Sequence, residues 1–244
     1  SMAVDLALDA SAKPDVLQQL REAATSLGYE TVAWERQVHG RVGKQHACPA
    51  PARLRPAAAP EAGAAQPRPQ LTRITLVIER LDQLQDVGAA NVVLAGYDLV
   101  AVVPQTEEVL ARCCAQPVMS AIDVISLPME HRLPYALSPS LLRKAARAGI
   151  HFEIRYSHVL RDSNTRRHLI ANALGLVRAA PLRSLIITSG AEGDAKLRAV
   201  EDVAHLATLF HLSVRQARRC FTVHARATIE RAAARRARQG GPNA

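Results

Sequence analysis

Residues 97–103 read YDLVAVV, and residues 104–115, PQTEEVLARCCA, follow them directly. The first segment is almost continuously apolar, which is typical of a strand buried on both faces in a parallel sheet. Pro104 is expected to end that strand, and residues 107–115 have the apolar spacing of a helix. A strand followed at once by a helix is the repeating unit of parallel α/β folds.

The same alternation of strand and helix runs outward from this segment in both directions. We expect the other strands at residues 4–8, 29–34, 73–79, 121–126, 150–156 and 185–188. We expect the other helices at residues 14–28, 139–148, 165–177 and 197–210, and from Ser213 onward. About seven such units favour a closed (β/α) barrel of the TIM type with parallel strands. An open doubly wound sheet stays the alternative.

Two segments interrupt or follow this alternation. Residues 36–70 contain repeated Pro and Ala and carry six basic groups against Glu61, so we interpret them as a flexible basic loop inserted in the domain. Residues 231–244 are expected to form a basic, disordered tail. We expect residues 1–230 to form a single barrel domain, and its last element to be a basic helix.

Composition narrows the class of protein. Hydrophobic residues make up 48% of the 244 residues, which is ample for a core. No run of about 18 apolar residues is present, so we expect no membrane span, and the first residues lack a secretory signal pattern. The four cysteines fit no zinc-binding spacing and are expected to be reduced.

Positive charge is concentrated at the C-terminal end of the chain. The net charge is +9, and residues 213–244, with eight arginines and one glutamate, supply +7 of it. Positive charge concentrated in one segment indicates a binding surface for a polyanion, and nucleic acid is the commonest polyanion. Aromatic residues are only 3% of the chain, so binding is expected to rest on phosphate contacts and shape rather than on base stacking.

Two groups of arginines are candidate phosphate contacts. Arg161, Arg166 and Arg167 gather where a strand ends and a helix begins, and an anion there would gain from the guanidinium groups and from free backbone N–H groups. The alternative is a solvated basic turn, or arginines paired with Asp162 and Glu192. The second group lies on the last helix and consists of Arg215, Arg218 and Arg219.

Catalytic and metal-binding signals are weak. Glu153 and Arg155 alternate with apolar residues on one strand, which favours a buried ion pair lining the barrel over a catalytic carboxylate. The nine histidines include no H-x-H and no H-E-x-x-H motif, and no phosphate-binding glycine motif is present. We therefore expect no catalytic residue, no metal site and no cofactor.

Five segments carry a family resemblance when they are taken in order. They are LGY at 27–29, LTRIT at 71–75, YDLVAV with PQTE at 97–107, FEIRYSHVLRDSNTRR at 152–167, and DVAHL with LF at 202–210. Together they resemble the 30-kDa protein subunit of the RNA-based endoribonucleases P and MRP. Arg73, Arg161, Arg166 and Arg167 match basic positions of that family, and their contact with RNA is our inference.

The resemblance implies a barrel related to the polymerase-and-histidinol-phosphatase superfamily that has lost its metal ligands. It implies a non-catalytic subunit that braces the catalytic RNA during removal of the 5′ leader from precursor tRNA. The implied partners are that RNA, other protein subunits including a small α/β protein, and precursor tRNA indirectly. The implied location is the nucleus and nucleolus. A metal-dependent phosphoesterase and a protein-only adaptor remain the alternative functions.

Overall fold

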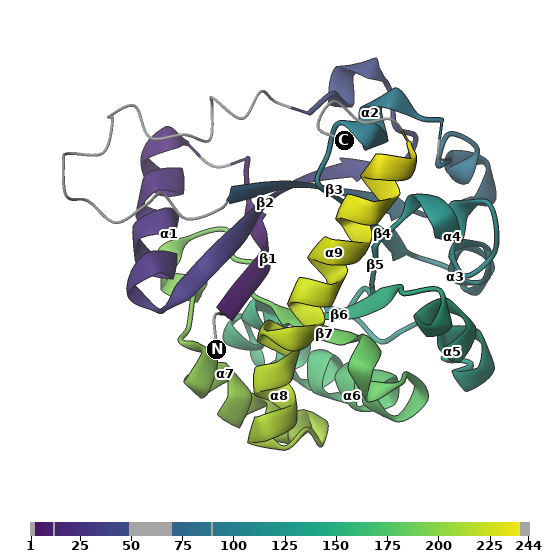
Figure 1. Ribbon diagram of the computed structural model, residues 1–244. Coiled ribbons are helices and arrows are strands. Elements are labelled where there is room, and N and C mark those ends of the chain that lie inside the picture. Colours follow the sequence, from purple (N-terminus) through teal and green to yellow (C-terminus); the bar gives the residue numbers. More distant parts are fainter. Residues whose placement is uncertain (1–2, 12, 49–69, 89, 240–244) are drawn as a thin grey trace.

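The computed structural model describes residues 3–11, 13–48, 70–88 and 90–239, and within these ranges seven parallel strands form one sheet in chain order. The strands are β1 Ala3–Asp9, β2 Tyr29–His39, β3 Gln70–Ile78, β4 Leu99–Pro104, β5 Val124–Ser126, β6 His151–Arg155 and β7 Leu185–Thr188. The sheet curls until its two edges meet (Figure 1). The prediction of a (β/α) barrel with parallel strands is confirmed.

The seam between β7 and β1 is held by few backbone contacts and several side-chain contacts. Leu8 and Ala191 form an isolated parallel bridge, and the backbone N–H of Asp9 donates to the Ala191 carbonyl at 3.0 Å. The Asp5 carboxyl accepts from the backbone N–H of Ser189 at 3.1 Å, and the Ser189 hydroxyl donates to the Ala7 carbonyl at 3.2 Å. The barrel is therefore nearly closed at this seam.

Helices cover the outside of the sheet, as the alternating pattern predicts. The α-helices in the described ranges are α1 Pro14–Ser26, α2 Val92–Ala95, α3 Glu107–Cys113, α4 Val118–Ala121, α5 Pro139–Arg147, α6 Ser163–Ala179, α7 Val200–Leu206, α8 Val214–Phe221 and α9 Val223–Arg238. Short 3₁₀ turns join them: η1 Lys44–His46, η3 Leu81–Leu84, η4 Tyr156–Leu160, η5 Leu182–Ser184, η6 Asp194–Lys196 and η7 Ala207–Phe210. Within the same ranges, no helix is long and apolar enough to cross a membrane.

Local sequence signals explain where the main helices begin and end. Pro14 and Pro139 occupy the first turns of α1 and α5, where a missing N–H costs nothing. The Asp162 side chain accepts from the backbone at the start of α6, and Ser213 does the same for α8. Gly149, with φ of +85°, follows α5 in a left-handed conformation that favours glycine.

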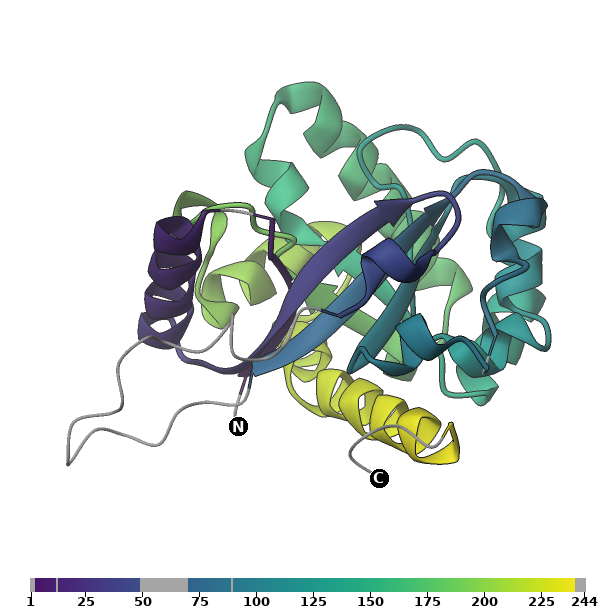
Figure 2. The same cartoon turned by 90° about the horizontal axis from the view of Figure 1, so that it is seen from above.

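The core is divided between the outside and the inside of the barrel. The larger cluster fills the space between the strands and the surrounding helices. The smaller one lies inside the barrel and includes Leu6, Leu99 and Ile186, packed with Ala225 and Ala232 of α9. Figure 2 shows α9 lying across the ends of the strands, so this helix closes the barrel at the amino-terminal ends of its strands.

The inserted loop begins later than the sequence pattern predicts. Residues 36–39 extend β2 and pair with β3 in regular register, and η1 follows at residues 44–46. The guanidinium of Arg36 donates to the carbonyls of Gln45 and Ala47, which holds this turn against the strand. The part of the predicted loop at residues 49–69 lies outside the described residues.

The C-terminal end also departs from the prediction. The expected single helix after Ser213 is two helices, α8 and α9, separated at Thr222. Residues 231–238, predicted as a disordered tail, form the last turns of α9. They are held there because Arg231 and Arg235 bond to residues at the amino-terminal ends of the strands. The Arg231 guanidinium donates to the carbonyls of Ala148, Met119 and Ile122. Residues 240–244 lie outside the described ranges.

Candidate nucleic-acid interface

The carboxyl ends of the strands surround a cavity of about 730 Å³. Its walls come from segments that follow most of the strands, among them Asp9, Gln105, Glu130 and Glu192. In (β/α) barrels this end carries the active site, because the loops after the strands converge there. The chemistry of this mouth therefore decides whether the barrel has an enzyme-like site.

Four charged side chains form an ion network across the barrel at the floor of this mouth. The Arg73 guanidinium contacts both oxygens of Glu153, at 2.5 and 2.7 Å. Arg155 donates to Glu153 at 3.0 Å and to both oxygens of Glu35. Thr188 donates its hydroxyl to Glu153 at 3.0 Å. The two carboxylates are thereby held by two guanidinium groups.

The network keeps its carboxylates ionised although they are buried. Burial opposes the negative charge of Glu153, but the guanidinium groups of Arg73 and Arg155 outweigh it and hold the pKa of Glu153 well below its usual range. Burial also opposes the charge of Glu35, and the same two arginines lower its pKa. The interpretation of Glu153 and Arg155 as a buried ion pair lining the barrel is confirmed.

The inference that Arg73 touches RNA needs correction. Its side chain has no exposed surface, and its donors are used by Glu153, by the Thr75 hydroxyl at 2.9 Å and by the Leu6 carbonyl at 3.0 Å. A guanidinium enclosed in the barrel and fully hydrogen-bonded cannot reach a phosphate at the surface. Arg73 is a structural residue of the buried network.

Arg161 lies at the rim of the mouth between two carboxylates. It donates to Glu130 at 2.7 Å and to Glu192 at 2.9 Å, and Lys196 also pairs with Glu192. The pairing with Glu192 is one of the alternatives that the sequence leaves open. His158 contacts Glu130 at 3.2 Å, and burial lowers its pKa to about 4, so the ring is neutral at neutral pH.

The other two arginines of the predicted phosphate clamp differ in their surroundings. Arg166 is exposed and donates its Nε to the Val159 carbonyl at 2.9 Å. Arg167 is exposed and makes no hydrogen bond or ion pair with another described residue. The helix N-terminus between them already has an anion, because the Asp162 carboxylate accepts from the N–H groups of Asn164 and Thr165. These hydrogen bonds, led by the one from Thr165, lower the Asp162 pKa to about 2.

The arginines of the last predicted helix lie on α8, away from the mouth. Arg215 and Arg219 are exposed, and neither pairs with a carboxylate in the described residues. Arg218 forms an exposed pair with Glu201 of α7. The structure therefore does not bring the two predicted arginine groups into one cluster: one lies at the start of α6 and the other on α8.

No group of three or more His, Cys, Asp or Glu side chains is placed to hold a metal ion in the described part of the chain. The carboxylates at the floor of the mouth already bond to arginines. Holding a cation there would require Glu35 or Glu153 to give up those bonds.

The chain is similar to known proteins over most of its length. The family model described as RNase P subunit p30 matches residues 2–237. Protein GAMETOPHYTE DEFECTIVE 1 of Arabidopsis thaliana is 30% identical over 227 residues, which are 86% of this chain and 39% of that protein. This chain thus spans well under half the length of the plant relative. Ribonuclease P protein subunit p30 of Mus musculus is 28% identical over 233 residues, covering 92% of this chain and 84% of the mouse protein.

A solved structure shares the fold. A chain of the cryo-EM structure of archaeal ribonuclease P with mature tRNA aligns with a TM-score of 0.62 and 13% sequence identity, covering 93% of this chain and 90% of that one. This likeness concerns the barrel architecture alone. Because the family match extends over nearly the whole chain, the chain belongs to the RNase P subunit p30 family.

Proposed function

We propose that this chain is a protein subunit of a ribonuclease P ribonucleoprotein, where it holds the catalytic RNA and does no chemistry itself. The observation that carries the proposal is the family match over residues 2–237. A mouse relative of similar length bears the name ribonuclease P protein subunit p30, and 92% of this chain aligns with it. Removal of the 5′ leader from precursor tRNA is then the activity of the complex.

Exposed arginines support the RNA-binding part of the proposal. Arg167, Arg215 and Arg219 lie at the surface without a carboxylate partner in the described residues. Arginine forks bind phosphate oxygens in pairs, and each neutralised phosphate releases condensed counterions. The proposed RNA-binding residues also include Arg161, Arg166 and Arg218. Arg161 and Arg218 are paired with glutamates, which compete with phosphate for their guanidinium groups.

The two buried carboxylates at the floor of the mouth support the non-catalytic part. General acid–base or nucleophilic work needs a carboxylate or histidine that is free to exchange a proton or bond with substrate. Glu35 and Glu153 are instead locked by arginines, and their lowered pKa values keep them from acting as acids near neutral pH. A metal-dependent phosphoesterase is disfavoured for the same reason.

Finer parts of the proposal follow from the family. They are a role in ribonuclease MRP besides ribonuclease P, a small α/β protein as the neighbouring subunit, indirect contact with precursor tRNA, and a nuclear and nucleolar location. The location is tested by microscopy of a tagged copy of the chain. The other three are tested by identifying the proteins and RNAs that copurify with it.

The test is affinity purification of the tagged full chain from its native cells under gentle conditions, followed by sequencing of the bound RNA. We expect the RNA component of ribonuclease P among the retained molecules. The variant Arg215→Gln with Arg219→Gln should retain less of it, with an unchanged circular dichroism spectrum. Retention of proteins without RNA would instead identify a protein-only adaptor, and hydrolysis of a generic phosphate ester by the isolated chain would identify a phosphoesterase.

A further inference from the structure

Four long stretches of the chain contain no aspartate and no glutamate. One of them, residues 36–60, lies partly outside the described residues. The other three are residues 131–152, 163–191 and 203–229, and together they hold twelve lysines and arginines. An acid-free run of this length leaves its cations without local counter-charges, so the position of the three runs in the fold is informative.

The fold places these runs side by side. The first contains α5, the second contains α6 and the turn η5, and the third contains η7 and α8. α5 packs beside α6, α6 packs against η7, and α8 packs on β7. Figure 1 shows α5, α6 and α8 as neighbours along one side of the barrel. We call the outer surface of α5, α6, η5 and α8 the basic wall.

The cations of α5 are all exposed. They are Arg143, Lys144 and Arg147, and none of them forms a hydrogen bond or ion pair with another described residue. The buried face of the same helix is apolar, with Leu142 and Ala145 against the core. α5 therefore directs its apolar side inward and three uncompensated positive charges outward.

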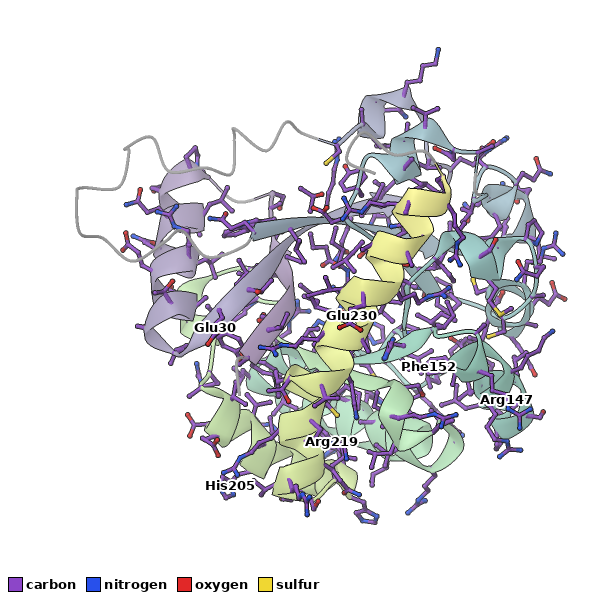
Figure 3. The ribbon with its side chains drawn as sticks, viewed as in Figure 1. Glu30, Arg147, Phe152, His205, Arg219 and Glu230 are labelled. Carbon is purple, nitrogen blue, oxygen red and sulfur yellow. The ribbon has the colours of Figure 1, made fainter. Side chains whose placement is uncertain are left out.

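α6, η5 and α8 continue this pattern across the wall. Arg178 near the end of α6 and Arg183 in η5 are exposed and have no carboxylate partner in the described ranges. On α8, Arg215 and Arg219 are likewise free of carboxylates, and Arg218 pairs with Glu201 at the border with α7. Figure 3 shows Arg147 and Arg219 on opposite sides of α6, so the positive charge extends over the width of the wall.

Three other helices, α1, α3 and α7, do not share this character. α1 begins with Asp15 and contains Glu22, α3 begins with two glutamates, and α7 carries Glu201 and Asp202. The mouth of the barrel contains four carboxylates among its walls. None of these three helices carries a net positive charge, and neither does the mouth, the end where barrel enzymes bind substrates. α9, which follows α8, carries two further exposed arginines, Arg226 and Arg238.

We infer that the basic wall is the docking surface for base-paired RNA, an inference that rests on the proposed function and adds the surface and the form of the RNA. Uncompensated like charges on neighbouring helices repel each other, and a polyanion removes that repulsion. The wall is as long as α6, whose 17 residues span roughly 25 Å. That length accommodates several consecutive phosphates of a helical RNA backbone.

The absence of exposed rings from the described part of the wall favours a duplex over a single strand. Phe210 and Phe221, the phenylalanines of the third run, are fully buried, and Tyr135 directs its hydroxyl to the Pro104 carbonyl. Single-strand binders stack bases on exposed aromatic side chains, whereas duplex RNA is recognised through phosphates, 2′-hydroxyls and shape. A wall of arginines without aromatic platforms matches the second mode.

The wall also relates the two arginine groups that the sequence singles out. Arg166 and Arg167 lie at the first turn of α6, and Arg215 and Arg219 lie on α8. Four further arginines, which no sequence motif distinguishes, extend the same surface: Arg143, Arg147, Arg178 and Arg183. The two groups thus remain separate clusters, and the wall is the surface on which both lie.

The experiment measures binding of the full chain to an RNA duplex of about 16 base pairs and to a single strand of the same length, across a salt series. The test variant is Arg143→Gln with Arg147→Gln on α5. The matched control is Arg21→Gln with Arg112→Gln, two cations on α1 and α3 that lack a hydrogen bond or ion pair in the described residues. Circular dichroism of all three proteins checks the fold.

We expect the wild type to prefer the duplex. The α5 variant should reduce the log–log salt slope by roughly 0.7–0.9 for each phosphate that it no longer neutralises. The control should keep the wild-type slope. Equal reductions in the α5 variant and the control, or equal binding of duplex and single strand, would overturn the inference.

The outcome separates this inference from the proposed function. If the α5 variant binds duplex normally while the tagged chain still retains ribonuclease P RNA from cells, the basic wall is not the RNA-docking surface, and the proposed subunit role is kept. If the α5 variant loses duplex binding while the tagged chain retains no such RNA, the basic wall does bind duplex RNA, and the proposed subunit role is rejected. Loss of a protein partner with full RNA binding would identify the wall as a surface for an acidic protein and overturn the inference.

Discussion

The guanidinium of Arg235 contacts both carboxylate oxygens of Asp123, at 3.0 and 3.1 Å, across a separation of 112 residues. Both side chains are almost completely buried. Arg235 also donates to the carbonyls of Tyr97 and Asp98 at the start of β4. A residue from the C-terminal end of the chain therefore fastens α9 to the amino-terminal ends of the central strands.

Replacing Arg235 is expected to destabilise the fold strongly. In Arg235→Met the Asp123 carboxylate stays buried without its guanidinium partner, and breaking a buried pair of this kind costs about 3–5 kcal/mol. The free energy of unfolding from urea titration measures the loss. Arg238→Met, an exposed position three residues later, should change it by less than about 0.5 kcal/mol. Equal stability of the two variants would show that the Asp123 pair does not hold α9 in place.

Deleting residues 231–244 is expected to damage the barrel and not simply to remove a basic extension. The deletion removes Arg231 and Arg235 and also Ala232, which packs in the inner core. The truncated chain should unfold at a lower urea concentration and expose its inner core to a hydrophobic dye. An unchanged unfolding midpoint would mean that these residues behave as the loose tail expected from the sequence.

Arg73 is expected to matter for stability and not for RNA contact. Arg73→Met leaves Glu153 with Arg155 as its remaining cation in the barrel, and we expect a loss of about 3–5 kcal/mol in unfolding free energy. Adding Glu153→Leu should recover part of the loss, because the unpaired buried charge is removed as well. At a temperature where Arg73→Met is still folded, its RNA affinity should equal that of the wild type. A loss of affinity without a loss of stability would return Arg73 to the RNA-binding set.

The seam of the barrel is expected to depend on pH through Asp5. Burial, offset only in part by hydrogen bonds from Ser189 and Ala7, raises the pKa of Asp5 to about 6. The folded state binds this proton more tightly than the unfolded state does. Protonated Asp5 therefore stabilises the folded state fully below about pH 4, and this stabilisation is lost as the pH rises through about 6. The loss is on the order of 3 kcal/mol.

The variant Asp5→Asn tests this relationship, since its amide oxygen can accept the same N–H groups and carries no charge. Asp5→Asn should be more stable than the wild type at about pH 7.5, and the difference should shrink as the pH falls toward about 4. The measurement is urea unfolding at several pH values. A variant that is less stable than the wild type at the higher pH would show that the ionised carboxylate stabilises the seam.

The order of strands and helices could be predicted from the sequence because each buried strand is a short apolar run. Residues 97–103 illustrate this, and β4 lies where that run predicts it. The position of Arg73 could not be predicted, because alternation along a strand does not reveal which face of a closed sheet is the inside. Here Arg73 and Thr75 point into the barrel, where partners from β2 and β6 compensate the charge.

The C-terminal end departs from the prediction for a related reason. A run rich in Ala and Arg has the composition of a solvated helix or a loose tail, and nothing nearby in the sequence offers a partner. The partners of Arg235 and Arg236 are Asp123 and Asp98, more than a hundred residues earlier. The acid-free runs, in contrast, are visible in the sequence, but only the fold shows that they lie beside one another.

The most direct test of the central claim is cleavage of precursor tRNA by material purified on the tagged chain, assayed before and after treatment with a nuclease that digests RNA. If this chain is a non-catalytic subunit of an RNA-based enzyme, the untreated material removes the 5′ leader and the treated material does not. Leader removal that survives complete digestion of the RNA would contradict the account, because the chemistry would then belong to protein.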